Sequence, residues 1–348
     1  MRKIKVFLGG YVNYSNAQNL NCSAIAKNLD QDKFKIYTLE VYFGASQSAS
    51  YNTFSCFWPF RITRHLGYLW GVINSDIMYL PKHLDTPIWV LKLANFLKKP
   101  IFTTIEGKVI DINEPDHNLI NLFGSLERMR RHFVYFNGIY AITSNILLSS
   151  NKIIKIQDDP LFLGVDFNGY SNCIKKELSS IIFVGSLTKR KRVDEFIKLA
   201  SFFPMLDFKI VGDGVEKERL KSLATNNITF LGALEHTKIN DVFLSSDLMF
   251  LPAKSEGFPK VILEAAASGT PCVVYNTYGA NEWITNNLDG FVVSNFEEVK
   301  DIVVRLIDEP QLLKTISSNS VLLASKYDWK VLIKDWEKVI EHLFNEHY

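Results

Sequence analysis

The chain has 348 residues, enough for about two domains at the usual size of roughly 100–200 residues each. With 47% hydrophobic and 22% charged residues it has a globular composition, which excludes disordered, collagenous and disulfide-scaffold classes. The formal net charge is +2, from 39 Lys and Arg against 37 Asp and Glu. Because a dedicated nucleic-acid binder normally carries a larger basic excess, no nucleic-acid partner is expected.

The first half of the chain alternates strand-like and helix-like segments. A strand over 4–8 is followed by Gly9-Gly10, a helix-like stretch covers 17–29, and a second strand covers 34–42. Apolar runs of strand length follow at 77–80, 101–105 and 138–142, whereas residues 44–60, rich in Ser, Asn and aromatic side chains, are interpreted as loop. Strand, helix and strand in succession predict a parallel sheet.

The second half restarts this alternation. Short buried strands are expected at 181–184, 207–211, 228–231, 248–251 and 271–275, with helices over 193–201 and 329–343. The polar, turn-rich residues 160–178 mark the boundary between two doubly wound domains. Because ligands of such sheets bind beside the carboxyl ends of the strands, a cleft between the two domains is the expected site.

Neither a metal site nor a membrane span is indicated. The four cysteines lie far apart with no C-x-x-C pair, and the seven histidines lack metal-ligand spacing, so buried free thiols and surface or structural histidines are expected. The segment MRKIKVFLGG has no signal-peptide pattern, and no apolar stretch approaches the roughly 20 residues that span a bilayer. We therefore expect a cytoplasmic protein, with peripheral contact at the inner face of the membrane.

The most informative segment is SEGFPKVILEAAASGTP, residues 255–271, which follows a strand. Pro259 suits the first turn of a helix, where its missing N–H costs nothing, and Gly269 suits the helix end. Glu256 then lies in the loop before the helix and Glu264 about two turns further on, so both can face one cleft. The helix N-terminus between them favours a phosphate, because its free N–H groups and its dipole attract negative charge.

This segment, with two glutamates separated by seven residues, resembles the donor-binding signature of retaining glycosyltransferases of the GT-B fold, family four, group 1 type. Four other motifs occur in the family's order: FVGSL at 183–187 followed by Lys191, VGDG at 211–214, FLG at 230–232 and YDW at 327–329. The resemblance covers residues 180–345 well, whereas in the first half only Gly9-Gly10 and LGVD at 163–166 share it.

The resemblance implies an α/β architecture of two Rossmann-like, doubly wound parallel-sheet domains that face a central cleft. Residues 1–168 would form an acceptor-side domain and residues 169–325 a donor domain that binds a nucleotide sugar. Residues 326–348 would form a helix that crosses back to the first domain.

The resemblance also implies a role for each matching residue. Glu264 would bind the ribose hydroxyls of a nucleotide, Glu256 would hold hydroxyls of the donor sugar, and Lys191 would neutralise the diphosphate. Gly9 and Gly10 would let the chain approach the diphosphate or the sugar closely. The remaining donor-binding positions are Gly185, Ser186, Arg190 and Gly212, with Gly232 and Ala233 against the base, and Gly257, Phe258, Pro259, Lys260 and Val261, where backbone N–H groups of 257–260 would hold the sugar.

Three positions depart from the family pattern. Ser186 stands where the family often has arginine and Arg192 where it has glycine, so either Arg190 or Arg192 is expected to supply the missing charge. Glu106, in the run TTIEG, stands where the family commonly has a histidine. If it faces the acceptor it would accept a proton or orient a hydroxyl, although packing at a strand end explains it equally well.

The expected function is a retaining glycosyltransferase of the hexosyltransferase type. It would move a sugar from a UDP- or GDP-linked donor to a saccharide or lipid-linked saccharide acceptor, in surface polysaccharide or glycolipid biosynthesis. Its catalytic residues would be Glu256, Lys191 and Glu106, and because no D-x-D motif lies near the site, neither a metal nor a cofactor is expected. A nucleotide-sugar 2-epimerase of the same fold and a non-catalytic sugar-nucleotide-binding subunit are the alternatives.

Two basic runs each allow two interpretations. KRKR at 189–192 is either a solvated charge run or, because it follows a strand and a glycine turn, the source of a phosphate-binding cation. RMRRHF at 128–133 is either a solvated helix face or a surface that attracts anionic lipid, which would suit a lipid-linked acceptor.

Overall fold

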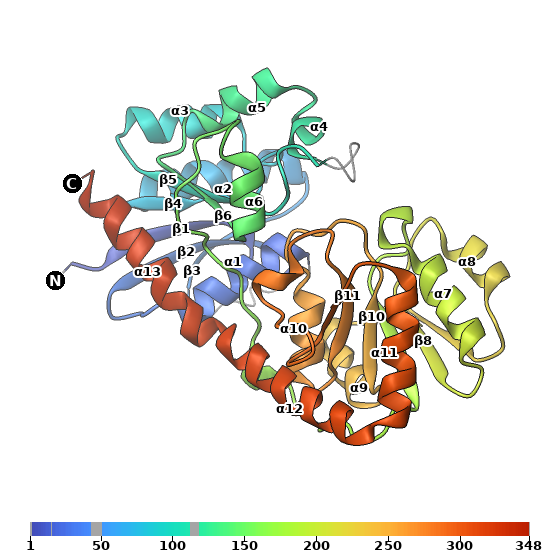
Figure 1. Ribbon diagram of the computed structural model, residues 1–348. Helices are drawn as coiled ribbons and strands as arrows, with labels where there is room; N and C mark the ends of the chain where they lie inside the picture. Colours follow the sequence, from blue (N-terminus) through green and yellow to red (C-terminus); the bar gives the residue numbers. More distant parts are fainter. Residues whose placement is uncertain (1, 15, 43–50, 112–117, 348) are drawn as a thin grey trace. The chain divides into compact units, whose positions relative to one another are not determined.

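The computed structural model describes residues 2–14, 16–42, 51–111 and 118–347. The chain divides into two compact units, each built from one sheet and its covering helices (Figure 1). The amino unit holds the described residues up to Gly164 together with those from Trp329 onward, and the carboxy unit holds Val165–Asp328.

The amino unit is built on six parallel strands in the order β3-β2-β1-β4-β5-β6, which is the Rossmann order. The strands are β1 (Ile4–Tyr11), β2 (Phe34–Val41), β3 (Asn52–Cys56), β4 (Ile77–Tyr79), β5 (Ile101–Ile105) and β6 (Gly138–Ala141). The helices are α1 (Ala17–Asn28), α2 (Phe60–Asn74), α3 (Ile88–Phe96), α4 (Leu119–Phe123), α5 (Leu126–Phe133), α6 (Ser144–Ser150) and α13 (Trp329–Asn345).

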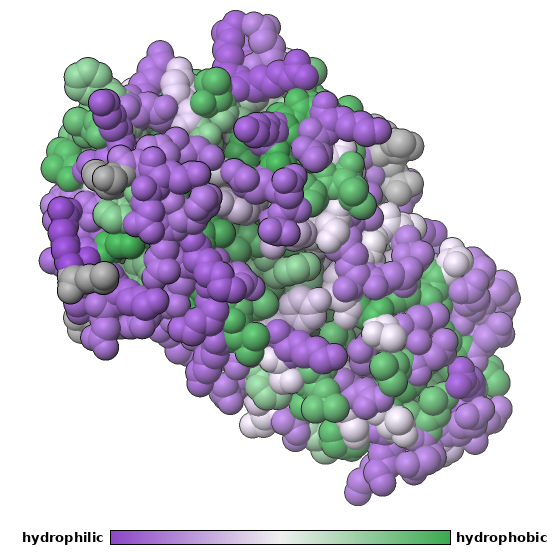
Figure 2. All heavy atoms as spheres, turned by 60° about the vertical axis from the view of Figure 1, so that its left-hand side comes forward, coloured by the Kyte–Doolittle hydropathy of each residue, from purple (hydrophilic) through white to green (hydrophobic). Residues whose placement is uncertain are grey.

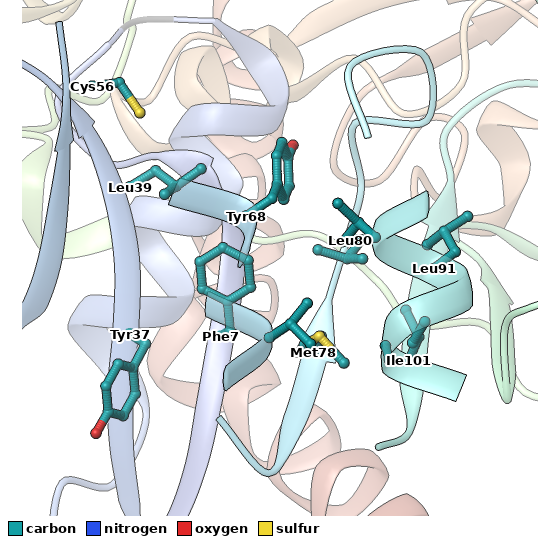
Figure 3. Packing of buried hydrophobic residues seen from close by; sticks show 12 residues of the cluster. Phe7, Tyr37, Leu39, Cys56, Tyr68, Met78, Leu80, Leu91 and Ile101 are labelled. Carbon is teal, nitrogen blue, oxygen red and sulfur yellow. The ribbon is translucent and has the colours of Figure 1, made fainter. Parts of the chain in front are cut away.

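The core of the amino unit holds α2 tightly against β1. The ring of Phe7 meets that of Tyr68 edge to face, with centroids 6.1 Å apart, among the apolar side chains of Figure 3. A Cβ on Gly71 would lie 2.5 Å from the Phe7 ring, so only a glycine lets the helix approach this closely. The position of α2 over the sheet is thereby fixed by packing.

The last helix of the chain, α13, belongs to the core of the amino unit. Trp336 is fully buried, meets Tyr79 edge to face at 5.1 Å, and donates its indole N–H to the carbonyl of Phe162 at 3.1 Å. Glu337 accepts the backbone N–H of Asp30 at 3.0 Å, which ties the same helix to the end of α1. This amphipathic segment folds as a helix over Trp329–Asn345 because its apolar face is buried in this way.

The carboxy unit repeats the design with six parallel strands in the order β12-β11-β10-β7-β8-β9. The strands are β7 (Ser180–Val184), β8 (Asp207–Val211), β9 (Ile228–Gly232), β10 (Leu248–Leu251), β11 (Cys272–Tyr275) and β12 (Phe291–Val293). The α-helices are α7 (Val193–Phe202), α8 (Lys217–Leu223), α9 (Ile239–Leu244), α10 (Lys260–Ala267), α11 (Phe296–Asp308) and α12 (Pro310–Lys326). Short 3₁₀ turns lie at η1 (Phe167–Gly169), η2 (Lys189–Lys191), η3 (His236–Lys238) and η4 (Ala280–Glu282).

Two doubly wound parallel sheets confirm the predicted α/β class, but some local expectations were wrong. Of the segment 44–60 interpreted as loop, 44–50 lies outside the described residues, while 52–56 is strand β3 and α2 begins at Phe60. The polar residues of β3 are tolerated in a strand because they bond to β2, with Ser55 donating to Glu40 at 2.6 Å. Gly9 and Gly10 continue β1 instead of ending it, since the strand runs to Tyr11.

Two smaller expectations also need correction or restriction. Cys22, Cys56 and Cys272 are buried free thiols as expected, but Cys173 is exposed. His117 lies outside the described residues.

On the face shown in Figure 2, hydrophilic side chains cover most of the surface and apolar residues reach it in scattered patches. Across the described ranges, none of the helices is both long enough and apolar enough to cross a membrane. The basic helix α5 buries Met129, His132 and Phe133 and leaves its arginines exposed. This arrangement fits both interpretations of that segment.

Candidate functional site

Three glycine turns meet at the carboxyl edge of the second sheet. Gly185 follows β7 and donates to the carbonyl of Val211 at 3.0 Å, and Gly212 follows β8 and donates to that of Gly232 at 2.8 Å. A Cβ on Gly212 would lie 1.9 Å from the carbonyl oxygen of Gly185, so the two turns touch backbone to backbone. The space that a Cβ on Gly232 would enter is empty to 4 Å, which leaves that turn open on one side.

A cluster of two cations and one carboxylate lies beside these turns. The short turn η2 follows the Gly185 turn and places Arg190 and Lys191 next to Glu256, in the loop before α10. The Glu256 Oε1 atom lies 2.5 Å from the Lys191 Nζ atom and 3.0 Å from the Arg190 Nη1 atom. Lys191 and Glu256 each keep only 10% of their side-chain surface exposed, so the pair is largely shielded from solvent. The cluster carries one surplus positive charge.

Arg190, and not Arg192, occupies the position beside the lysine. The Arg190 guanidinium also donates to the backbone carbonyl of Ser255, which binds η2 to the loop before α10. Arg192 instead pairs with Glu195 and lies over the ring of Tyr275, 5.2 Å from its centroid. Its backbone is left-handed with φ at +49°, which explains why a glycine is suited to this position.

The N-terminus of α10 lies next to the cluster. Pro259 caps the helix with extended backbone, and the first helical bond runs from Ile262 N–H to the Pro259 carbonyl at 3.0 Å. Because Pro259 has no N–H, the donors of this turn come from Gly257, Phe258, Lys260 and Val261.

Aromatic packing holds the loop before α10 in place. The buried ring of Phe258 packs against Trp283, with centroids 5.3 Å apart, and against Tyr327, at 5.7 Å. The motif YDW thus contributes Tyr327 to the support of this loop. Phe258 is therefore a packing residue whose contribution to a ligand would come from its backbone alone.

One turn into α10, Glu264 forms a second polar group with a residue that the sequence analysis did not single out. Its Oε1 atom lies 3.3 Å from the Nε2 atom of His236, which belongs to the loop after Gly232 and Ala233. This hydrogen bond to Glu264 raises the pKa of His236 above its usual value. The position of His236, four residues beyond the strand-end glycine Gly232, is the signal that could have identified it.

Tyr278 is a second residue that sequence reasoning missed. It follows β11 at the same edge of the sheet, is 2% exposed, and its hydroxyl has no hydrogen-bond partner in the part of the chain that the structure describes. Burial, together with the nearby charge of Glu256, raises the pKa of this hydroxyl well above its usual value, so it stays protonated. Its place just after a strand end was visible in the sequence.

The predicted residues of the amino unit have packing explanations. A Cβ on Gly9 would lie 2.6 Å from Leu80, and one on Gly10 would lie 2.7 Å from the sulfur of Cys22. Close packing inside β1 therefore accounts for both glycines, and their role at a diphosphate stays a prediction. Glu106 follows β5 and accepts a hydrogen bond from the side-chain amide of Asn21 at 3.2 Å.

The structure thus brings together Gly185, Arg190, Lys191, Gly212 and Glu256 with the first turn of α10, and groups Glu264 with the loop after Gly232. Ser186 and Ala233 are exposed beside these groups. In the described residues, no three or more His, Cys, Asp or Glu side chains are grouped so that they could hold a metal ion.

Comparison with known proteins shows what the carboxy unit is similar to. The family model "Glycosyl transferases group 1" matches residues 171–321, which include both charged groups. This part of the chain is thus similar to the group 1 glycosyltransferases.

Curated relatives carry the same assignment over more of the chain. An uncharacterized glycosyltransferase of Haemophilus influenzae is 27% identical over 286 residues, which are 78% of this chain and 71% of that protein. An N,N'-diacetylbacillosaminyl-diphospho-undecaprenol α-1,3-N-acetylgalactosaminyltransferase of Campylobacter jejuni is 25% identical over 313 residues, 82% of each chain.

The crystal structure of the Anabaena protein HepE in complex with UDP and glucose shares the fold of this chain. The two structures have a TM-score of 0.74 and 19% identity, covering 98% of this chain and 100% of that one. The GT-B fold predicted from the motifs is confirmed.

Proposed function

We propose that this chain is a glycosyltransferase that transfers a hexose-type sugar from a nucleotide diphosphate to a saccharide or lipid-linked saccharide, with retention of the anomeric configuration. The observation that carries the proposal is the convergence of Lys191 and Arg190 on Glu256 at the N-terminus of α10. Its surplus positive charge and the amides of the helix end suit a diphosphate. A nearby carboxylate suits the hydroxyls of a sugar.

The proposed chemistry follows from where charge develops. As the bond from the anomeric carbon to the diphosphate oxygen breaks, positive charge grows on the sugar and negative charge on the leaving group. Lys191, Arg190 and the first turn of α10 would stabilise that negative charge, at about 2.7–4 kcal/mol for one well-placed donor. The acceptor oxygen forms the new bond to the anomeric carbon and gives up its proton to the departing diphosphate oxygen.

Glu264 and His236 lie beside the open turn at Gly232, where we place the nucleoside. The carboxylate of Glu264 would accept hydrogen bonds from ribose hydroxyls, and the backbone of Gly232 and Ala233 would lie against the base. We propose that the diphosphate binds without a metal ion, because Lys191, Arg190 and the amides of the α10 N-terminus supply the positive charge that it needs.

The names of relatives and of structurally similar proteins support the choice of substrates. The HepE structure contains UDP and glucose, and the Campylobacter relative is named for a diphospho-undecaprenol acceptor. We therefore propose a UDP- or GDP-linked donor and an acceptor from polysaccharide or glycolipid assembly. For Glu106 we propose a contact with the acceptor, reached through its position after β5.

The direct test incubates the chain with a panel of UDP- and GDP-sugars, with and without lipid-linked saccharides, and measures released nucleotide and product. Release that requires an acceptor is expected, and NMR of the product should show the anomeric configuration of the donor. Release of free nucleotide and altered sugar without any acceptor would instead identify a 2-epimerase. Tight nucleotide binding without turnover of any pair would identify a binding subunit.

A pair of variants tests the assignment of Glu256. Glu256→Gln should lower kcat/KM by about 100-fold or more, because it removes a charge that orders both cations and holds the sugar. Glu218→Gln, on α8 with 83% of its side chain exposed, is the matched control and should keep full activity. Full transfer by Glu256→Gln would refute the role of this carboxylate.

A further inference from the structure

A second polar cavity lies in the amino unit, at the carboxyl edge of its sheet. Its volume is about 540 Å³, and residues from four separate segments line it. The lining residues are Tyr11 at the end of β1, Tyr14 and Asn16 after it, Val41 at the end of β2, Phe60, Arg61 and Arg64 on α2, and Lys82 and Asp85 after β4. In the strand order, β1 and β4 are the neighbours at which the winding of the sheet reverses, and ligands of open α/β sheets bind at that point.

The charges of this cavity are out of balance. Three cations, Arg61, Arg64 and Lys82, face one carboxylate, that of Asp85, among the lining residues. Asp85 takes a hydrogen bond from the Nη1 atom of Arg64 at 2.7 Å, while the Nζ atom of Lys82 lies 3.6 Å from it, beyond hydrogen-bond distance. The cavity therefore holds two more positive than negative charges.

Two of these cations are incompletely paired. The Nε atom of Arg64 is buried and has no hydrogen-bond partner among the residues that the structure describes, while 28% of its side-chain surface is exposed. Lys82 is 7% exposed, and its ammonium group lies 4.8 Å from the ring centroid of Tyr11. An anion in the cavity would accept charge-assisted hydrogen bonds from the ammonium group of Lys82 and from the outer nitrogens of Arg64.

Apolar surface adjoins the cationic part of the cavity. The rings of Tyr11, Tyr14 and Phe60 line it, and Phe60 is still 48% exposed. Phe57 and Trp58, which precede α2, are 52% and 81% exposed, more than aromatic side chains usually are. A ligand that bears an anionic group and an apolar chain would cover both kinds of surface.

We infer that this cavity binds the diphosphate of a ligand that carries an apolar chain. The guanidinium fork of Arg64 and the ammonium of Lys82 would hold the phosphate oxygens, with Arg61 at the exposed side. The apolar chain would lie on Phe60 and the aromatic residues before it. We identify this ligand as the sugar acceptor, and this identification rests on the proposed function. The acceptor would then be a saccharide that is linked to a lipid through a diphosphate.

The inference can be tested without any transfer reaction. Isothermal titration calorimetry in saturating UDP, which occupies the proposed nucleotide site, compares three probes: geranyl diphosphate, inorganic pyrophosphate and geraniol. Geranyl diphosphate should bind at least tenfold more tightly than either of the others, because it alone has both parts. Equal affinity for pyrophosphate would overturn the apolar part of the site, and equal affinity for geraniol would overturn the anionic part.

Variants assign the binding to this cavity. Arg64→Gln and Lys82→Met should each weaken geranyl diphosphate binding by about tenfold or more, with Arg64→Lys intermediate. Arg305→Gln, on α11 and away from both cation clusters, should leave it unchanged. Melting curves of each variant establish that it is folded.

The variant Asp85→Asn tests whether Asp85 competes with the ligand for Arg64 or holds the cavity in shape. The two roles predict opposite changes in the affinity for geranyl diphosphate. If Asp85 only competes with the ligand for Arg64, its neutralisation should strengthen geranyl diphosphate binding several-fold. Weaker binding by Asp85→Asn, or unchanged binding by Arg64→Gln, would overturn the inference. Transfer activity with no binding here would refute this cavity alone, whereas binding with no transfer from any donor would contradict the proposed function alone.

Discussion

Each unit has its own six-stranded parallel sheet, and the charged groups at the carboxyl edges of the two sheets differ. In the carboxy unit the cations Lys191 and Arg190 are paired with Glu256, and the glycine turns beneath them touch backbone to backbone. In the amino unit the cavity at the same edge leaves the cations Arg64 and Lys82 with unused donors. One fold thus presents a charge cluster whose cations share a carboxylate and another whose cations outnumber the single carboxylate beside them.

The two sites also differ in how far they can be predicted from the sequence. The carboxy cluster comes from two short segments, 185–192 and 255–264, in which strand, glycine and charge follow one another directly. The amino cavity gathers residues from four segments that have no pattern of their own, so only the folded chain brings them together. Contiguity in the chain, and not chemical importance, made one site predictable.

The largest expected effect is a loss of stability, and it tests whether the close backbone contact between the Gly185 and Gly212 turns requires glycine. Gly212→Ala should destabilise the chain by about 3 kcal/mol or more, because its Cβ would lie 1.9 Å from a backbone oxygen and its φ is +141°. Gly232→Ala, where the Cβ meets nothing within 4 Å, should cost only about 1 kcal/mol for its φ of +71°. Urea unfolding measures both. Equal losses would show that the contact of the two turns is not what requires glycine.

The next largest effect is on nucleotide affinity, and it tests whether Lys191 binds the phosphates of a nucleotide. Lys191→Ala should weaken UDP or GDP binding by about 10- to 100-fold, through loss of a charge-assisted contact, and leave nucleoside binding unchanged. Lys189→Ala is the matched control, since Lys189 belongs to the same basic run but is exposed. Similar losses for the nucleoside, or for Lys189→Ala, would favour a solvated charge run.

A smaller effect is the pH dependence of the stability of the amino unit. Two histidines, His83 and His132, are buried there in a cluster with the rings of Phe123, Phe133 and Phe136. Burial lowers the pKa of His83 to about 3 and that of His132 to about 4. Because the unfolded chain binds these protons near pH 6.5, stability should fall as the pH drops from 6.5 toward 4. Each histidine should contribute roughly 2 kcal/mol to the loss between pH 7 and pH 5.

The variant His132→Phe checks this dependence. It keeps an aromatic ring in the cluster and removes one of the two groups, so urea midpoints at pH 7 and pH 5 should lie closer together than in the parent chain. An unchanged difference between the two pH values would contradict the proton linkage of this cluster.

Sequence patterns predicted most of the parallel strands, because strands buried on both faces are short apolar runs. They missed β3, whose Asn, Thr and Ser side chains bond to β2, and β12, which has only three residues. In the site, Lys191, Glu256 and Glu264 occupy the strand ends and helix start that their motifs indicated. His236 and Tyr278 were missed because their positions matter only through contacts with residues distant in the chain.

The path of the chain through α13 affects how the protein is made. Val165 donates to the carbonyl of Tyr327 at 2.9 Å, so the carboxy unit closes its own ends as one uninterrupted piece. The amino unit, by contrast, lacks Trp336 until the final helix has been synthesised. During translation the amino unit, which begins to leave the ribosome first, is therefore completed last, and a stop codon before Trp336 would harm its core before it harmed the carboxy unit.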